Sequence, residues 1–505
     1  MAAQIPPLPR SWTGRRVLLW QTLLITMCAA LLWFYTAHNR FPYFYHTDEP
    51  GKVRQVIDGT RNFHHPLLMI AATDLALRVL HRERTPQNVA IVGRWFSAVA
   101  SVLAIVGLVV LASRHFGPGL GLLAGALAGL HPVLFQSAHW MKEDCGLLAG
   151  IVWTFVALDS FSRRQSRAAI VFAGVACGVA VSAKYLGLLV LLPAFALIII
   201  EERPRGWQAV VKSIVLLLGS ALLAFALINS QALFHPASAL GGAATEFEHM
   251  AQTGRPGLFQ TNYLPKLVRR AGAPMLIAVV VYVGGLIARR ERKPFEWVML
   301  SFWALFLFVL SFTPLSKDRY LLPVLTFFCF MAVASFRFAI GSLAGRGKFL
   351  QGAVVFLCLA AVAAPWLPLI WRSQREFGSD SRKEMIAWIR TNLPGDAVIA
   401  HDSRIWPEHD DTLAADFSVP QKRIAAQHFL SEFKSIEQLR RAGATHAVVT
   451  GKFYRDLIEG AEVVPVRADQ NFYFELAKRS TSLWRAQRGA ILYLHPGLDV
   501  YELPR

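Results

Sequence analysis

The sequence is short of charged residues and of cysteine. Asp, Glu, Lys and Arg make up 17% of its 505 residues, whereas soluble domains carry about a quarter. Its five cysteines form no CxxC pair and lie within or beside apolar segments, which predicts small buried side chains rather than metal or redox chemistry. No cysteine follows Cys358, so a disulfide-bonded domain after that residue is excluded.

The net charge is +19, but the sequence lacks motifs that would indicate nucleic-acid binding. It has neither zinc-finger spacing nor a glycine-rich phosphate loop. Its basic residues gather in short segments between apolar runs, such as "SRRQSR" and "ARRERK". Cytoplasmic loops of membrane proteins accumulate Lys and Arg, and anionic lipid headgroups favour them there. We therefore expect membrane lipids, and no nucleic acid, among the partners.

Apolar residues are abundant: they make up 54% of the chain, and the mean hydropathy is +0.40. Many apolar runs are about 18 to 22 residues long, enough for a helix to cross roughly 30 Å of hydrocarbon. The first run is long and has no small-residue cleavage motif, which favours a signal anchor over a cleaved signal peptide. The runs predict about eleven transmembrane helices, at 17–37, 93–112, 119–136, 145–161, 168–182, 186–200, 212–229, 271–288, 297–313, 321–341 and 351–370.

Loop charge predicts the orientation of these helices. The N-terminus is basic, and so is every second loop that follows it. This pattern places the N-terminus in the cytoplasm and the end of the last helix outside. Shifting the register by one helix would move every basic cluster to the outer face, so the alternative orientation is disfavoured.

The character of the chain changes near residue 373. The segment "SRKEMIAWIRTNLPGDAVIAHDS" predicts a helix, a turn and a strand, and "SIEQLRRAGATHAVVTG" repeats that order. The segment "LDVYELP" predicts a closing strand. The sequence thus predicts a polytopic α-helical membrane domain over 1–372 and a small extracytoplasmic α/β domain over 373–505.

Ionisable residues that the orientation signal leaves unexplained lie at the outer ends of the helices, in loops 38–92, 137–144, 230–270 and 314–320 and beside the break "SAKY". Such groups at membrane depth are costly and mark function. Carboxylates can act as a general base or hold a metal, and Lys and Arg can hold phosphate. The mixture suits a lipid-linked phosphate substrate. The candidates are Asp48, Glu49, Arg54, Lys142, Glu143, Asp144, Lys184, Tyr263 and Arg319.

An ordered set of motifs resembles the C superfamily of glycosyltransferases, in the branch that contains protein O-mannosyltransferases and lipid A aminoarabinose transferases. The first loop carries "HTDEP", and a His-Pro element, "NFHHPLLMI", follows it. The later segments "AHWMKEDCGLLAGIVWTF", "GVAVSAKYLGLLVLLP" and "SKDRYLLPVLTF" are typical of the same branch. The resemblance covers most of residues 10–370 and implies the GT-C fold.

The resemblance also implies an activity. Members move a sugar from a polyprenyl phosphate to an acceptor on the extracytoplasmic face, usually with inversion, and a bacterial inner (plasma) membrane is the expected location. Asp48 matches the first-loop catalytic acid and would be the general base. Asp144 matches the second-loop Asp and would orient the acceptor or share that role. Lys184 and Arg319 occupy plausible phosphate-binding positions.

Other candidates rest on the residues themselves. Glu49 is a further catalytic candidate, and Lys142 and Arg54 are further phosphate ligands. Glu143 and Tyr263 could contact the acceptor, whether lipid, glycan or protein. The sequence departs from the family pattern at "DEPGK" and at the run "KED", and the loop 230–270 does not align residue by residue. The transferred sugar, hexosyl or pentosyl, stays open.

Each candidate also has a structural explanation. Asp144 could cap a helix, Lys184 could extend to the headgroups, and Arg319 could pair with Asp318. Tyr263 could be an interfacial anchor.

A divalent metal held by His64 and His65 with Asp48 or Glu49 is possible, but the spacing is not a recognised ligand signature. A transporter of lipid-linked sugars would need an internal repeat with a midplane site, and none is visible. A non-catalytic scaffold would leave the acidic loops unexplained.

Overall fold

The computed structural model describes residues 14–39, 44–252, 263–289, 293–312, 317–342, 347–402, 405–406, 417–427, 429–450 and 468–504. Parts of two predicted outer loops, 253–262 and 314–316, lie outside these residues. The chain divides into two compact units. One unit comprises Met1–Asn39 and Asp48–Ile370, and the other comprises Arg40–Thr47 and Trp371–Arg505. The predicted boundary at 372/373 stays a prediction.

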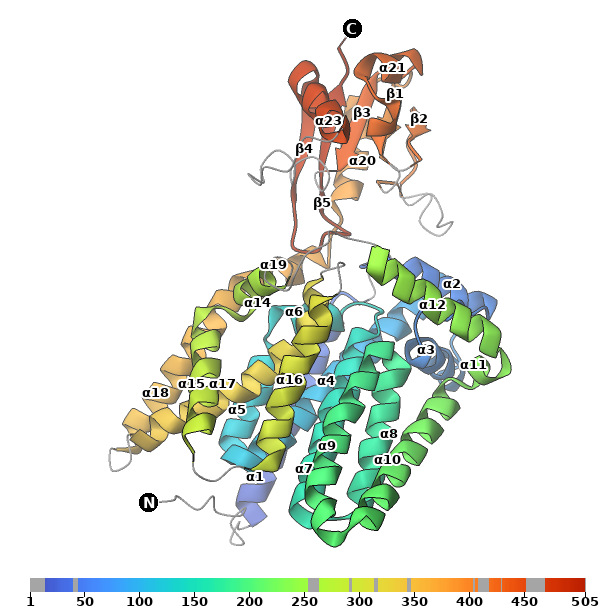
Figure 1. Ribbon diagram of the computed structural model, residues 1–505. Coiled ribbons are helices and arrows are strands. Elements are labelled where there is room, and N and C mark those ends of the chain that lie inside the picture. Colours follow the sequence, from blue (N-terminus) through green and yellow to red (C-terminus); the bar gives the residue numbers. More distant parts are fainter. Residues whose placement is uncertain are drawn as a thin grey trace. The chain divides into compact units, whose positions relative to one another are not determined.

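The first unit is helical throughout (Figure 1). Its elements are α1 (Gly14–Thr36), α2 (Glu49–Asp58), α3 (Leu68–Val79), α4 (Pro86–Phe116), α5 (Pro118–Gly129), α6 (Pro132–Ala138), α7 (Asp144–Arg164), α8 (Arg167–Ala183), η1 (Tyr185–Val190), α9 (Leu191–Glu202), η2 (Arg203–Arg205), α10 (Trp207–Ile228), α11 (Ser230–Phe234), α12 (Pro236–Gln252), α14 (Leu264–Ala271), α15 (Ala273–Ala288), α16 (Pro294–Ser311), η3 (Asp318–Leu321), α17 (Leu322–Ser342), α18 (Lys348–Ala363) and η4 (Ala364–Trp366).

Within the described residues, eight helices are long and apolar enough to cross a membrane. Two bent pairs, α5 with α6 and α14 with α15, raise the number to ten when each is one span, and α8 is a shorter apolar helix. Each of these segments coincides with one of the eleven predicted helices. The chain is therefore an integral membrane protein of the predicted class.

Both bends follow from local sequence. The α5–α6 pair bends by 67° at His131, whose side chain accepts a hydrogen bond from the Val133 nitrogen as the new helix begins at Pro132. The α14–α15 pair bends by 101° at Gly272, which has φ +78 and is followed two residues later by Pro274. Left-handed backbone favours glycine, and proline cannot continue the preceding helix. The predicted span 119–136 is thus a broken one, whereas the bend at Gly272 lies at the start of the predicted span 271–288 and α14 lies almost entirely within the predicted loop 230–270.

Helices α4, α7, α8 and α10 pack side by side in that order (Figure 1). The α7–α8 approach is close because α7 carries a glycine where the two backbones meet. A Cβ on Gly150 would lie 2.6 Å from the Ala180 nitrogen. This packing aligns the start of α7 with the end of α8, which matters for the polar residues located there.

The second unit contains α19 (Leu367–Glu376), which begins in the first, followed by a five-stranded sheet. Strand order is β2-β1-β3-β5-β4, parallel among β2, β1 and β3 and antiparallel from β3 onward. The elements are α20 (Ser381–Asn392), β1 (Val398–His401), β2 (Lys422–Ala425), η5 (Leu430–Phe433), α21 (Ile436–Arg441), β3 (His446–Thr450), α23 (Ala468–Arg479), β4 (Thr481–Arg488) and β5 (Pro496–Glu502). The prediction of a C-terminal α/β domain is confirmed.

Asp402, directly after β1, ties this unit together. Its Oδ1 accepts hydrogen bonds from the Leu430 nitrogen at 2.8 Å and the Tyr473 hydroxyl at 2.9 Å, and its Oδ2 accepts one from the Thr450 nitrogen at 3.1 Å. The side chain is buried. Burial raises the pKa of Asp402 to about 6, because desolvation outweighs the three hydrogen bonds.

This pKa shift predicts a pH-dependent stability of the second unit. The folded-state pKa lies above the ordinary value of 3.8, so the stabilising contribution is present below about pH 4 and is lost as the pH rises through about 6. The shift of roughly two units corresponds to about 3 kcal/mol. Hydrogen exchange of β1 and β3 in the full-length chain, corrected for intrinsic exchange, should show less protection at pH 6.5 than at pH 4.5. Asp402→Asn should remove that difference, and an unchanged pH dependence in the variant would contradict the assignment.

Candidate active site

The segment between α1 and α3 includes a short helix, α2, which turns acidic and basic residues toward the bundle. Asp48 precedes the helix, Pro50 occupies its first turn, and Gly59, with φ +72, ends it. Glu49, Lys52, Val53 and Val56 face inward and are buried. Because these positions are three or four residues apart, they share one face of the helix. Two charged side chains are therefore carried into the protein by an otherwise apolar face.

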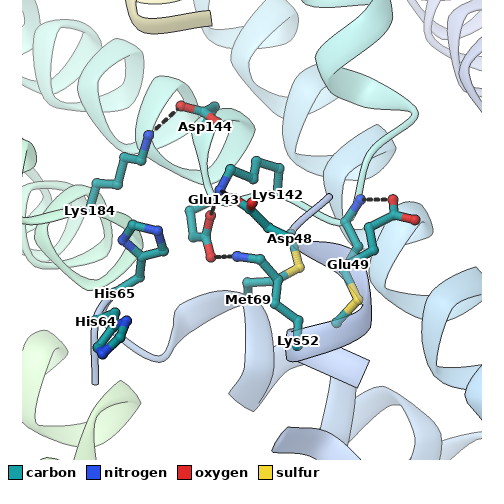
Figure 2. Close-up of polar contacts among 12 residues, drawn as sticks. Asp48, Glu49, Lys52, His64, His65, Met69, Lys142, Glu143, Asp144 and Lys184 are labelled. Carbon is teal, nitrogen blue, oxygen red and sulfur yellow. Dashed lines mark hydrogen bonds and ion pairs between the residues drawn. The ribbon is translucent and has the colours of Figure 1, made fainter. Parts of the chain in front are cut away.

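Two ion pairs join this segment to the turn before α7. The Lys142 ammonium pairs with the Asp48 carboxylate, and the Lys52 ammonium pairs with the Glu143 carboxylate. Lys142 also lies 3.6 Å from Glu143. Figure 2 shows the four side chains converging, with Met69 of α3 beside them. Lys52, Lys142 and Glu143 are buried, whereas the Asp48 side chain is 40% exposed.

A third acidic residue gathers two basic residues from later helices. Asp144 begins α7, and its Oδ1 accepts a hydrogen bond from Lys184 at 2.6 Å. Its Oδ2 lies 3.6 Å from the Arg319 Nε. Lys184 is in extended backbone between α8 and η1, and Arg319 is in η3. The ring of Tyr320 lies under both cations, 4.6 Å from the Lys184 ammonium and 5.3 Å from the Arg319 guanidinium.

The resulting polar cluster consists of Asp48, Lys52, Lys142, Glu143, Asp144, Lys184 and Arg319, four cations and three carboxylates. Burial lowers the pKa of Lys52 well below its ordinary value, and the Lys142 ammonium lowers it further. Burial also lowers the pKa of Lys142, while the Asp48 carboxylate opposes that shift. Such a cluster, with a surplus of positive charge and one exposed carboxylate, can hold an anion next to a proton acceptor.

Solved structures of other proteins align with nearly the whole chain. ArnT from Cupriavidus metallidurans, solved bound to undecaprenyl phosphate, aligns over 97% of this chain and 98% of its own, with a TM-score of 0.54 at 14% identity. An oligosaccharyltransferase from Archaeoglobus fulgidus in the apo form aligns over 94% of this chain and 73% of its own, with a TM-score of 0.55 at 13% identity. The chain has the GT-C fold.

The sequence comparison agrees with this assignment. A family model described as dolichyl-phosphate-mannose-protein mannosyltransferase matches residues 64–232, which is less than half of the chain. No curated protein sequence matches. The GT-C fold that the resemblance implied is thus confirmed, and the family model matches part of the segment on which the resemblance rests.

Within the GT-C fold, Glu49 lies apart from the polar cluster. It is fully buried, its Oε2 accepts a hydrogen bond from Arg94 of α4 at 2.8 Å, and its Oε1 accepts one from the Met141 nitrogen at 2.8 Å. These contacts hold α2 against α4 and fix the turn before α7. They favour a structural role for Glu49, although it is adjacent to Asp48 in the sequence.

The remaining candidates are also dispersed. Arg54 is exposed on α2. Tyr263 is buried before α14, and burial, followed by Tyr320, raises the pKa of its hydroxyl. Asp318, the alternative partner considered for Arg319, accepts a hydrogen bond from Arg270 at 2.6 Å. Arg319 lies beside Asp144 instead. Lys184 pairs with Asp144 at 2.6 Å, whereas the alternative explanation for it was extension to the headgroups.

The sequence analysis did not identify two residues that the structure places at or beside the site, Lys52 and Arg94. Lys52 is four residues after Asp48, a spacing that places both on one helix face, but α2 was not among the predicted helices. Arg94 lies within the predicted helix 93–112, where an ionisable side chain signals a buried partner.

The described residues contain no group of three or more His, Cys, Asp and Glu side chains that could hold a metal. His65 instead lies 3.8 Å from Glu246 of α12, and burial, followed by the Lys142 ammonium, lowers the pKa of its imidazole well below the ordinary value.

We predict that Glu49→Gln destabilises the protein by about 3 kcal/mol or more, because it leaves the Arg94 charge buried without a carboxylate. Asp58→Asn is the matched control, since Asp58 is exposed at the end of the same helix. Thermal unfolding of both variants in detergent checks this. A Glu49→Gln midpoint equal to that of wild type would contradict the structural role of the Glu49–Arg94 pair.

Proposed function

We propose that this chain is an integral membrane glycosyltransferase that moves a sugar from a polyprenyl-phosphate donor to an acceptor on the extracytoplasmic face. The observation that carries the proposal is the polar cluster, which combines one partly exposed carboxylate with buried and partly buried cations from separate segments. The ArnT structure was solved with undecaprenyl phosphate. An Archaeoglobus fulgidus oligosaccharyltransferase aligned over 94% of this chain and 74% of its own, with a TM-score of 0.52 at 12% identity, was solved with dolichol-phosphate and an inhibitory peptide.

The reaction is a single displacement in this proposal. Asp48 takes the proton of an acceptor hydroxyl or amine, whose lone pair forms the new bond at the anomeric carbon. The bond from that carbon to the phosphate oxygen breaks, and its electron pair leaves on polyprenyl phosphate. Attack opposite the leaving group inverts the anomeric configuration, and the sugar passes through an oxocarbenium-like state. Hexosyl and pentosyl donors are both compatible with this chemistry.

The cations of the polar cluster stabilise the leaving phosphate. Lys184 and Arg319 are held by Asp144 at the junction of α7, α8 and η3, so their positions are set before the donor arrives. Preorganised cations act most strongly in a site of low dielectric. Lys142 has two roles in this proposal. It pairs with Asp48 before the donor binds, and it can then turn to the incoming phosphate, which frees Asp48 to act as the base.

Loop charge supports the orientation. The helix α7 has Asp144 at one end and Arg163 and Arg164 at the other. Positive charge marks the cytoplasmic end, so the polar cluster belongs to the outer end and the N-terminus to the cytoplasm. The bacterial inner membrane remains our proposed location, and the acceptor is a lipid, a glycan or a protein.

The first test replaces the proposed base. Detergent-purified Asp48→Asn should still bind a short-chain polyprenyl-phosphate sugar, because the cations remain, but its release of free sugar or product should fall at least about 10²-fold. Asp58→Asn, the same chemical change at an exposed site of α2, should turn over like wild type. If Asp48→Asn matches wild type in turnover, Asp48 is not the base. If wild type binds no lipid phosphate, the donor assignment is wrong.

The second test separates Asp144 from the base. Asp144→Asn removes the carboxylate that positions Lys184 and Arg319, so we expect kcat/KM for the donor to fall about 10²-fold with weaker donor binding. Asp48→Asn should leave donor binding intact, so the two variants should differ in this measurement. Equal donor affinities for wild type and Asp144→Asn would contradict the positioning role.

A further inference from the structure

A second polar site lies between α3 and α11, among residues other than those of the polar cluster. A hollow of about 200 Å³ is lined by Arg61, Asp74 and Arg78 on its polar side and by residues of α10 and α11 opposite. Figure 1 shows α3, α10 and α11 together in the first unit. The junction is built from buried contacts, since Asn229 Oδ1, between α10 and α11, accepts a hydrogen bond from the Leu67 nitrogen at 2.7 Å. The hollow is therefore part of the packed fold.

The polar side of this hollow has more positive than negative charge. Asp74 accepts hydrogen bonds from Arg78 and Arg84, each at 2.6 Å. Arg61 lies at the same edge and donates to the backbone carbonyls of Gln55 and Thr60. The lining thus has two guanidinium groups, of Arg61 and Arg78, and one carboxylate, Asp74, which also pairs with Arg84 outside the lining. Arg61 is partly buried. Guanidinium groups bind phosphate through paired hydrogen bonds, so an anion would balance this surplus.

The hollow also has apolar lining residues, three of them at α3 and one at the end of α10, next to Ser230 and Gln231 of α11. Leu67, Ala71, Leu75 and Ile228 line the hollow. Leu75 is exposed, and so are Leu222, Leu223 and Leu227 of the membrane helix α10. The hollow lies at the end of that helix, where headgroups meet acyl chains. A ligand that places a phosphate among the arginines and hydrocarbon against the leucines matches this mixed lining.

We propose that the hollow between α3 and α11 binds the phosphate headgroup of an anionic membrane phospholipid, with its acyl chains along α10. The opposite side of α3 carries Met69, which lies beside the polar cluster (Figure 2). The bound lipid thus supports the helix that backs the polar cluster. The site is separate from the proposed donor site and stands on its own residues.

The test measures lipid retention by native mass spectrometry of the delipidated, detergent-purified full chain. Phosphatidylglycerol is added to one sample and phosphatidylcholine with the same acyl chains to another. Wild type should retain phosphatidylglycerol more strongly. Arg78→Gln should weaken retention about fivefold, and Arg61→Gln with Arg78→Gln about 25-fold, at the expected contribution of one arginine at a charged lipid surface.

Arg82→Gln is the matched control, because Arg82 is exposed just after α3 and does not line the hollow. It should weaken retention less than about twofold, whereas diffuse surface attraction would make all the arginines equal. Arg78 is exposed, so its single variant keeps the test valid if the double variant fails to fold.

Three results would overturn the proposal: equal retention of both lipids, equal effects of Arg78→Gln and Arg82→Gln, or displacement of the lipid by millimolar inorganic phosphate regardless of its acyl chains. The last result would mean that the site recognises phosphate alone.

Discussion

The Glu49 carboxylate is the contact on which the rest of the site depends. It binds Arg94 of α4 and the Met141 backbone nitrogen at the same time. One buried anion therefore holds α2 against the bundle and also sets the turn from which Lys142, Glu143 and Asp144 project. A charge removed from water is stable only when it is paired and hydrogen-bonded. A shift of either α2 or the turn would break one of these contacts and leave a buried polar group without its partner.

Once that turn is in place, the remaining charges are arranged by the same requirement. Lys52 and Glu143 are both buried and balance one another, and Asp144 balances Lys184. Asp48 differs because its side chain is partly exposed. In the proposed reaction this difference assigns the roles: the buried pairs define a fixed, polarised surface, and the exposed carboxylate is the group that an acceptor can reach. An incoming phosphate could share these cations with the carboxylates that hold them.

The helix α3 connects this polar cluster with the proposed lipid site. One side of α3 presents Met69 to the cluster, and the other side presents Asp74 and Arg78 to the hollow beside α11. Both sides combine apolar packing with paired charges, which suits a helix at the membrane surface. In an enzyme whose proposed donor is a lipid, surrounding lipids are part of the site's environment, and arginines at headgroup level are the means by which the protein would sense them.

By itself, the sequence determined the membrane-spanning helices and their order. Apolar runs predict membrane spans because an unpaired backbone in hydrocarbon is too costly for any other structure, and all eleven predicted runs have counterparts among the described helices. The alternation of apolar segments and turns likewise predicted the C-terminal sheet. The sequence did not predict the bends at His131 and Gly272, because His-Pro and Gly-Ala-Pro can also occur within a tilted span.

Only the tertiary structure decided how the charges are paired. Asp48 and Glu49 are neighbours in the sequence, yet one faces Lys142 and the other Arg94, because successive residues of a helix point in different directions. Lys184 and Arg319 meet at Asp144, although 40 and 175 residues of chain separate them from it. Pairing over such separations depends on which helices pack together, and packing is a property of the whole bundle that no local pattern encodes.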